Sequence, residues 1–122
     1  MIKGLLHAGV LVTDTATALA FYQGVLGLAV DATRPDLGYP GAWLWTGVQQ
    51  IHLMELPGAG PRPDAHAHGG RDRHLALAVS NLDALRARLE QARLTYTLSR
   101  SGRRALFCRD PDGNALEFVE QI

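Results

Sequence analysis

The sequence predicts an α+β fold made of two βαβββ modules, one after the other in the chain. The first observation is a repeat. An apolar run that opens at His7 is followed seven residues later by Asp14, and a run that opens at His74 is followed seven residues later by Asn81. Aspartate and asparagine are both preferred at the N-terminus of a helix, so each run predicts a strand that leads into a capped helix.

A second pair of apolar runs repeats at nearly the same offset. The run around His52 lies 45 residues after the first opening histidine, and the run around Glu117 lies 43 residues after the second. Self-similarity at a fixed offset indicates a duplicated structural unit. We therefore expect one domain over residues 1–122, with module one at 1–56, a linker at 57–71 and module two at 72–122.

Module one begins with a Leu- and Val-rich strand, and Asp14 or Thr15 then caps a helix that runs to about Val25. Leu19, Tyr22, Val25 and Leu26 form its apolar stripe, and Gly27 ends it. A loop of two prolines and two glycines spans 35–41. The predicted strands of this module are 3–12, 28–34, 42–46 and 49–56.

Module two follows a linker that holds three prolines and four glycines. Its helix begins after Asn81 and carries an apolar stripe of Leu82, Leu85, Leu89 and Ala92. The sequence Asp110-Pro111-Asp112-Gly113 predicts a tight turn. The predicted strands are the run that starts at His74, then 95–98, 104–108 and 114–120.

Composition narrows the classes of function. Lys plus Arg and Asp plus Glu number 12 each, which gives no reason to expect a nucleic-acid or membrane partner. No apolar run approaches the roughly 20 residues that span a bilayer. The single cysteine, Cys108, excludes an internal disulfide, fits a reducing compartment and lies in an apolar strand where we expect it to be buried and inert. We therefore expect a cytoplasmic protein without a nucleic-acid or membrane partner.

Four metal-capable side chains share one predicted face of the sheets. Alternation along each strand puts His7, His52, His74 and Glu117 opposite the residues that face the helices. A single histidine in an apolar strand is usually structural, but a buried glutamate is costly without a partner. Three imidazoles and a carboxylate suit a divalent transition metal, with Zn, Ni, Co, Mn and Fe(II) all candidates.

Other polar residues carry weaker expectations. By parity, Glu55 and Glu120 lie on the opposite face near the ends of their strands, where we expect them to be solvated. His66 and His68 lie in the linker and are expected to be exposed.

Several motifs resemble the vicinal oxygen chelate superfamily, also called the glyoxalase/bleomycin resistance/dioxygenase family. They are the Phe-Tyr pair with Leu-Gly-Leu in 21–28, the strand containing His52, the strand containing His74, and Asp-Pro-Asp-Gly-Asn running into Leu-Glu-Phe in 110–118. The resemblance implies paired βαβββ modules that form a cup around a divalent metal. It assigns His7, His52, His74 and Glu117 to the ligand positions, and it implies a homodimer.

The resemblance leaves the reaction open. A glyoxalase-like lyase or isomerase would use His52 or Glu117 to move a proton, although relatives of that type usually have glutamate or glutamine at the position of His52. An extradiol dioxygenase would hold ferrous iron with His7, His74 and Glu117, and His52 would be a second-sphere acid or base. A fosfomycin-type thiol transferase would use the same three ligands.

The alternative from a different class is a metal-free protein that sequesters an antibiotic, as bleomycin resistance proteins do. The four metal-capable residues argue against it, because such relatives usually lack the ligands. Trp45 is a candidate substrate contact within a set of strand aromatics. Arg100 and Arg103 belong to a group of loop arginines that we expect to be solvated loop charges, and that would favour an anionic substrate if they face the cup.

Overall fold

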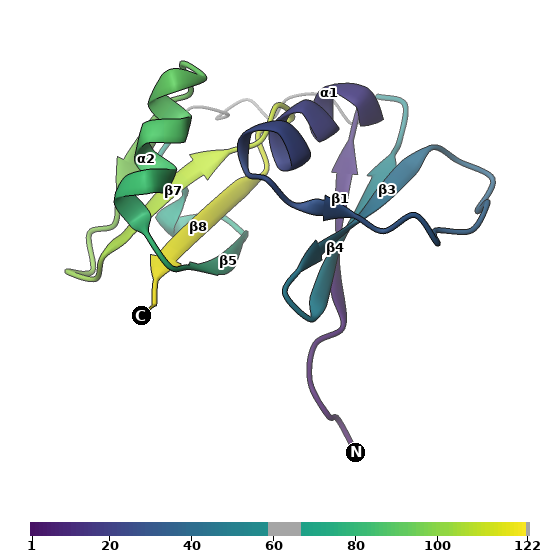
Figure 1. Cartoon of the computed structure of the whole chain (residues 1–122), viewed down its shortest axis with the longest axis horizontal. Helices are drawn as coiled ribbons and strands as arrows, with labels where there is room; N and C mark the ends of the chain where they lie inside the picture. Colours follow the sequence, from purple (N-terminus) through teal and green to yellow (C-terminus); the bar gives the residue numbers. More distant parts are fainter. Residues whose placement is uncertain (59–66, 122) are drawn as a thin grey trace. The chain divides into compact units, whose positions relative to one another are not determined.

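The structure, a computed structural model, describes residues 1–58 and 67–121, and the chain divides into two compact units, Met1–Gly60 and Pro61–Ile122. Each unit contains one four-stranded sheet, ordered β1-β4-β3-β2 in the first and β5-β8-β7-β6 in the second (Figure 1). In both sheets the first strand is parallel to the last strand of its unit, and the other pairs are antiparallel. The predicted pair of βαβββ modules is confirmed.

The elements of the first unit follow the expected order. They are β1 (His7–Val12), α1 (Thr15–Leu19), the π-helix η1 (Ala20–Val25), β2 (Ala29–Val30), β3 (Gly41–Thr46) and β4 (Gln49–Glu55). Those of the second unit are the short 3-10 helix η2 (Gly69–Arg71), β5 (His74–Val79), α2 (Leu82–Gln91), β6 (Tyr96–Leu98), β7 (Ala105–Arg109) and β8 (Ala115–Glu120).

The first helix starts as predicted but changes its winding. The Asp14 carboxylate accepts a hydrogen bond from the backbone N–H of Thr17, and Gly27 has a φ of 78° just beyond the helix. Between them, the widened π turn shifts which side chains face the sheet. Ala18, Phe21 and Tyr22 are buried, whereas the predicted stripe residues Leu19, Val25 and Leu26 are only half-buried.

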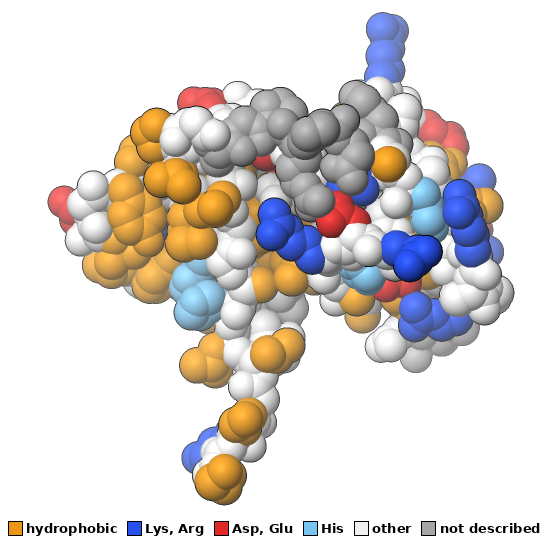
Figure 2. Space-filling model, turned by 180° about the vertical axis from the view of Figure 1, so that it is seen from behind, with side chains coloured by type: hydrophobic (Ala, Val, Ile, Leu, Met, Phe, Trp, Pro, Cys, Tyr) orange, Lys and Arg blue, Asp and Glu red, His pale blue; other side chains and the backbone are white. Residues whose placement is uncertain are grey.

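Two predicted strands are too long. The strand expected over 28–34 is limited to β2, because the Asp31 carboxylate accepts hydrogen bonds from the backbone N–H and the hydroxyl of Thr33 and turns the chain. The strand expected over 3–12 starts only at His7. Figure 2 shows hydrophobic side chains along the protruding N-terminal residues, which include the exposed Met1, Ile2, Leu5 and Leu6.

The second helix follows the sequence pattern closely. The Asn81 side chain accepts from the backbone N–H of Ala84, which confirms the predicted cap. Leu82, Leu85 and Leu89 are buried, but Ala92 is exposed because the helix has already ended at Gln91. The predicted turn that begins at Asp110, directly before β8, is also confirmed. Its backbone and side-chain hydrogen bonds are present.

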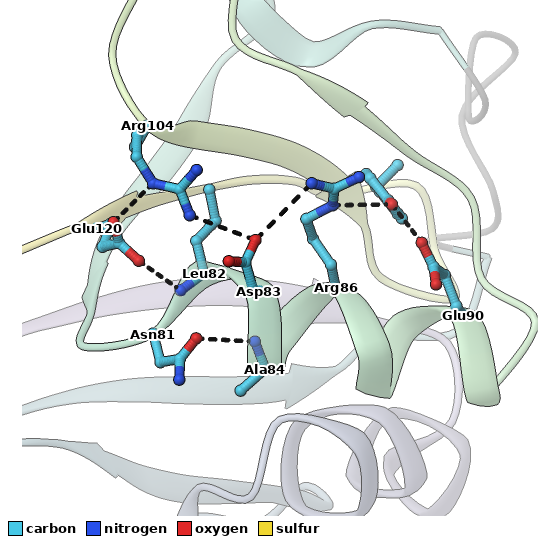
Figure 3. A network of polar contacts seen from close by, with 9 residues as sticks. Asn81, Leu82, Asp83, Ala84, Arg86, Glu90, Arg104 and Glu120 are labelled. Carbon is cyan, nitrogen blue, oxygen red and sulfur yellow. Dashed lines mark hydrogen bonds and ion pairs between the residues drawn. The ribbon is translucent and has the colours of Figure 1, made fainter.

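The expectation that Glu55 and Glu120 are solvated is wrong. The Glu55 carboxylate accepts from the backbone N–H of Thr15 at 2.8 Å, and Glu120 accepts from the backbone N–H of Leu82 at 2.9 Å (Figure 3). Each glutamate therefore caps the helix of its own unit from the end of the last strand, where a negative charge also complements the helix dipole. The duplication extends to this long-range contact.

The lowered pKa of Glu120 predicts that the stability of the fold depends on pH. Hydrogen bonds from Arg104 and from the backbone N–H of Leu82 hold the pKa of Glu120 below its usual 4.5. A carboxyl with a lowered folded-state pKa stabilises the fold at neutral pH and loses that contribution as the pH falls through the folded-state value. We expect Glu120→Gln to lower the thermal midpoint at pH 7, and the difference from wild type to shrink below pH 4.5.

The same change at exposed Glu90 is the control for the loss of one negative charge, because a glutamine there can still accept the hydrogen bond from the Tyr96 hydroxyl and no helix N-terminus loses its cap. A difference between wild type and Glu120→Gln that stays constant from pH 7 down to acid unfolding would contradict this account of the cap.

Part of the predicted linker belongs to the second unit. Gly69 is buried, and a Cβ on it would lie 3.1 Å from the Ala115 side chain and 3.3 Å from the Phe107 ring. Gly69 therefore packs against β7 and β8 of the second unit. No helix in residues 1–58 and 67–121 is long and apolar enough to cross a membrane.

Candidate metal centre

Each unit places two of the predicted donors on the face of its sheet that points away from the helix. In β1, Val10 and Val12 are buried on the helix side, and His7 lies on the other face. The register pairs Gly9 with His52 across β1 and β4.

The second unit repeats this arrangement. Its register pairs Ala76 with Glu117 across β5 and β8, so Glu117 takes the place that His52 has in the first unit. His74 in turn lies on the same face as Glu117, two residues before Ala76.

In the second unit the two donors face each other directly. The Nε2 atom of His74 lies 3.3 Å from Oε1 of Glu117, and the Glu117 residue is only 4% exposed. The other ring nitrogen of His74, Nδ1, donates to the backbone carbonyl of Asp72 at 2.8 Å. This backbone contact orients the ring and reserves Nε2 for the carboxylate side, as second-sphere contacts do for metal-binding histidines.

Arg103 holds the second oxygen of the same carboxylate. Its Nη2 donates to Oε2 of Glu117 at 2.9 Å, and its Nε is 3.3 Å from the hydroxyl of Ser101. The Arg103 side chain is 58% exposed, so most of the guanidinium remains in water. The buried charge of Glu117 is thus compensated from the β6–β7 connection, by a residue that the sequence indicated only as a possible substrate contact.

The two donors of the first unit are arranged differently. The rings of His7 and His52 are stacked, with centroids 3.9 Å apart and planes 13° from parallel. The other face of His52 stacks on Trp43, at 4.3 Å and 8°. Imidazole lone pairs lie in the ring plane, so two stacked rings do not point at a common ion, and His7 has to rotate before both could bind one.

The environment of His52 favours its neutral form. Burial is the largest cause that lowers the pKa of His52, followed by the nearby charges of His7 and Arg34, while Asp31 acts in the opposite direction. Its Nε2 is 2.7 Å from the side-chain oxygen of Gln50. A neutral imidazole retains one lone pair, as both ligation and proton transfer require.

The residues with weaker expectations, apart from Arg103, contact none of the four predicted metal donors in the contacts described above. Trp45 is 42% exposed on β3 and pairs in register with Gln50, and Arg100 is exposed in the β6–β7 connection. The expectation that His68 is exposed is wrong in part, because its Nδ1 is hydrogen-bonded to the Thr97 hydroxyl and its ring lies against Phe107. His66 lies outside the described residues.

The sequence missed the supporting residues Asp31, Gln50 and His68. Among them only the position of Gln50 carried a signal, since it shares the face of His52 two residues away. Within residues 1–58 and 67–121, no three His, Cys, Asp or Glu side chains gather around one point. The donors instead form two pairs, one in each unit.

Cys108 has no place in this chemistry. It is buried in β7, and burial together with the charge of Asp110 raises the pKa of its thiol to about 12. A thiol with this pKa stays protonated at neutral pH and is a poor nucleophile and a poor metal ligand.

Curated sequences include two matches that span nearly all of this chain. The chain is 31% identical to the uncharacterized protein YaeR of Escherichia coli (strain K12) over 133 residues, which cover 98% of this chain and 98% of that protein. It is 30% identical to Glyoxylase I 4 of Arabidopsis thaliana over 122 residues, which cover 95% of this chain and 70% of that protein.

Solved structures share the fold. A putative glyoxalase family protein from Bacillus anthracis superposes with a TM-score of 0.83 at 24% identity, covering 100% of this chain and 98% of that one. TnmS3, an antibiotic binding protein from Streptomyces sp. CB03234, superposes with a TM-score of 0.74 at 20% identity, covering 99% and 98%.

The match to a known family spans almost the whole chain, from residue 4 to residue 118. It includes both units and every strand that carries a candidate donor. The chain therefore belongs to the Glyoxalase/Bleomycin resistance protein/Dioxygenase superfamily.

Proposed function

We propose that the chain is a divalent-metal-dependent enzyme that binds a small substrate through two neighbouring oxygen atoms. The observation that carries this proposal is the pair formed by His74 and Glu117. With Nδ1 of His74 donating to a carbonyl, a neutral ring turns the lone pair of Nε2 towards a carboxylate oxygen. Two electron-pair donors at 3.3 Å repel each other unless a cation, a proton or a metal ion, lies between them.

The spacing of this pair suits a metal ion. Nitrogen and oxygen donors bind zinc at about 2.0–2.2 Å, which puts two donors on one ion roughly 3–3.5 Å apart. A distance of 3.3 Å falls in that range without any movement of either side chain. Imidazole nitrogen and carboxylate oxygen are also the donor types that Zn, Ni, Co, Mn and Fe(II) share.

We propose His7 as a third ligand, as the resemblance to the superfamily implies. When bound, the ion would act as a Lewis acid that stabilises negative charge developing on the substrate oxygens. His52 is the candidate for moving a proton, because it is neutral and half-buried on the same sheet face as His7. Arg103 orients the Glu117 side chain, and with Arg100 it would favour an anionic substrate group.

Among reactions, we favour a glyoxalase-like lyase or isomerase. The name of the Arabidopsis relative supports this choice, and so does a histidine that is available for proton transfer. An extradiol dioxygenase with iron held by His7, His74 and Glu117 is the second candidate. Both versions use the same ligands and differ in the metal and the substrate.

The test is metal analysis of the purified protein, followed by assays with a hemithioacetal, catechols and fosfomycin. We expect one divalent ion per site and turnover of the hemithioacetal. Turnover of a catechol with iron alone would favour the dioxygenase. Protein that stays metal-free after incubation with each ion, and that binds an antibiotic without changing it, would replace the proposal with sequestration, in line with the antibiotic binding ascribed to TnmS3.

We also propose a homodimer, as the superfamily commonly forms, in which a site could combine units from two copies. Mixing a His74→Ala chain with a His7→Ala chain tests this directly. Recovery of metal binding in the mixture, with one intact site in each heterodimer, is expected only if one site draws its ligands from two chains.

A further inference from the structure

We infer that Asp31 and Gln50 are positioning residues that fix His52 with its hydrogen on Nε2, so that Nε2 of His52 is not available to a metal ion. The inference deepens the proposed function and rests on it for its second half. The evidence lies entirely within the first unit and consists of a directional chain of hydrogen bonds that ends at His52.

The chain starts at the carboxylate of Asp31. Its Oδ1 accepts from the backbone N–H of Thr33 at 2.9 Å and from the Thr33 hydroxyl at 2.7 Å. Its Oδ2 accepts from the side-chain nitrogen of Gln50 at 2.8 Å. These bonds hold the pKa of Asp31 below its usual value, so the group is ionised at neutral pH and can only accept.

An acceptor at Asp31 determines how the Gln50 amide is oriented. If the amide were reversed, its oxygen would face a carboxylate oxygen at 2.8 Å without a hydrogen between them. The NH2 group of Gln50 must therefore face Asp31, which leaves its oxygen facing Nε2 of His52 at 2.7 Å. That oxygen accepts, so Nε2 has to donate, and the lone pair of the neutral ring is on Nδ1.

Ring contacts hold the imidazole in this position. Trp43 and His7 stack on its two faces and fix the plane of the ring, and a half-turn within that plane would move Nε2 away from the Gln50 oxygen. Trp43 is itself linked to the start of the chain of hydrogen bonds, because its carbonyl accepts from the backbone N–H of Asp31 at 2.8 Å.

His52 and His74 thus donate through different ring nitrogens. In His74 the donor is Nδ1, which faces the backbone carbonyl of Asp72, while Nε2 lies 3.3 Å from Oε1 of Glu117. Gln50 holds the hydrogen of His52 on Nε2. A metal ion cannot bind a nitrogen that carries a hydrogen, so binding through Nε2 of His52 would require the loss of the Gln50 contact.

The experiment uses the full chain labelled with ¹⁵N and long-range ¹H–¹⁵N spectra of its histidines, which distinguish the two tautomers. In the metal-free protein we expect His52 to be the Nε2–H tautomer. On addition of Zn²⁺ we expect nitrogen shifts at His7 and His74, with Nε2 of His52 still carrying its hydrogen. An Nδ1–H tautomer, or a metal ion coordinated by Nε2 of His52, would overturn the inference.

Variants separate positioning from folding. Gln50→Leu should abolish the tautomer preference of His52, whereas Gln49→Leu, at an exposed neighbour, should leave it intact. The double change Asp31→Asn with Gln50→Glu reverses donor and acceptor at that contact and still offers an acceptor to His52. It should restore the Nε2–H tautomer, and failure to do so in a folded double variant would contradict the proposed chain of hydrogen bonds.

The outcome is independent of the proposed function in one respect. The tautomer of His52 is measured in metal-free protein, so that part of the inference is tested without any metal ion. If Zn²⁺ shifts no histidine at all, the proposed metal centre fails while the positioning of His52 by Gln50 is still decided.

Discussion

Glu117→Gln is expected to reduce the affinity for a divalent metal by more than about 100-fold, because changes to residues that merely support a ligand already cost about 10- to 100-fold. The same substitution should leave the metal-free protein as stable as wild type or more so. Glu117 is buried, while its partner Arg103 is largely in water. Removing one partner of a buried ion pair is costly because it leaves the other charge buried, and that cost does not arise where the remaining partner is exposed to solvent.

Calorimetric metal titration and chemical denaturation of the metal-free protein test the two halves of this expectation. Glu120→Gln is the matched control, since it removes the same charge three residues away on the same strand. It should keep metal affinity and lose stability, the reverse pattern. A Glu117→Gln protein that binds metal as wild type does would show that this carboxylate is not a ligand.

Leu89→Ala is expected to lower the free energy of unfolding by about 2–5 kcal/mol, the usual cost of deleting a fully buried leucine side chain. Leu89 is completely inaccessible to solvent and lies on the face of α2 that packs on the sheet of the second unit. Since small domains are stable by only about 5–15 kcal/mol, the variant should have a much lower denaturation midpoint.

The control for this substitution is Leu98→Ala in β6, where the side chain is 53% exposed. Equilibrium denaturation should show a change several times smaller there than at Leu89. Equal losses at the two positions would mean that burial of the α2 stripe contributes little to the stability of the second unit.

Local patterns in the sequence were sufficient for the architecture. The helix caps Asp14 and Asn81 and the stripe of Leu82, Leu85 and Leu89 were all found, because caps and periodic burial depend on residues within a few positions of one another. The same alternation placed each donor on the correct face of its strand.

Contacts between distant residues were not predictable in the same way. Glu55 and Glu120 accept hydrogen bonds from helix N-termini 40 and 38 residues earlier in the chain. Their positions near the ends of strands predicted solvated side chains, because the sequence does not show which helix lies beside them. The contacts of His68 likewise depend on Thr97 and Phe107, which no local pattern connects to it.

The sequence by itself determined the duplicated βαβββ units, the start of each helix and the four side chains that share the faces opposite the helices, because these follow from short-range periodicity and capping. Only the tertiary structure decided which contacts those side chains make within each unit. It set His74 and Glu117 3.3 Å apart and stacked His52 between His7 and Trp43. The reason is physical: hydrogen-bond direction and ring stacking depend on atoms from separate strands, and those come together only when the sheet forms.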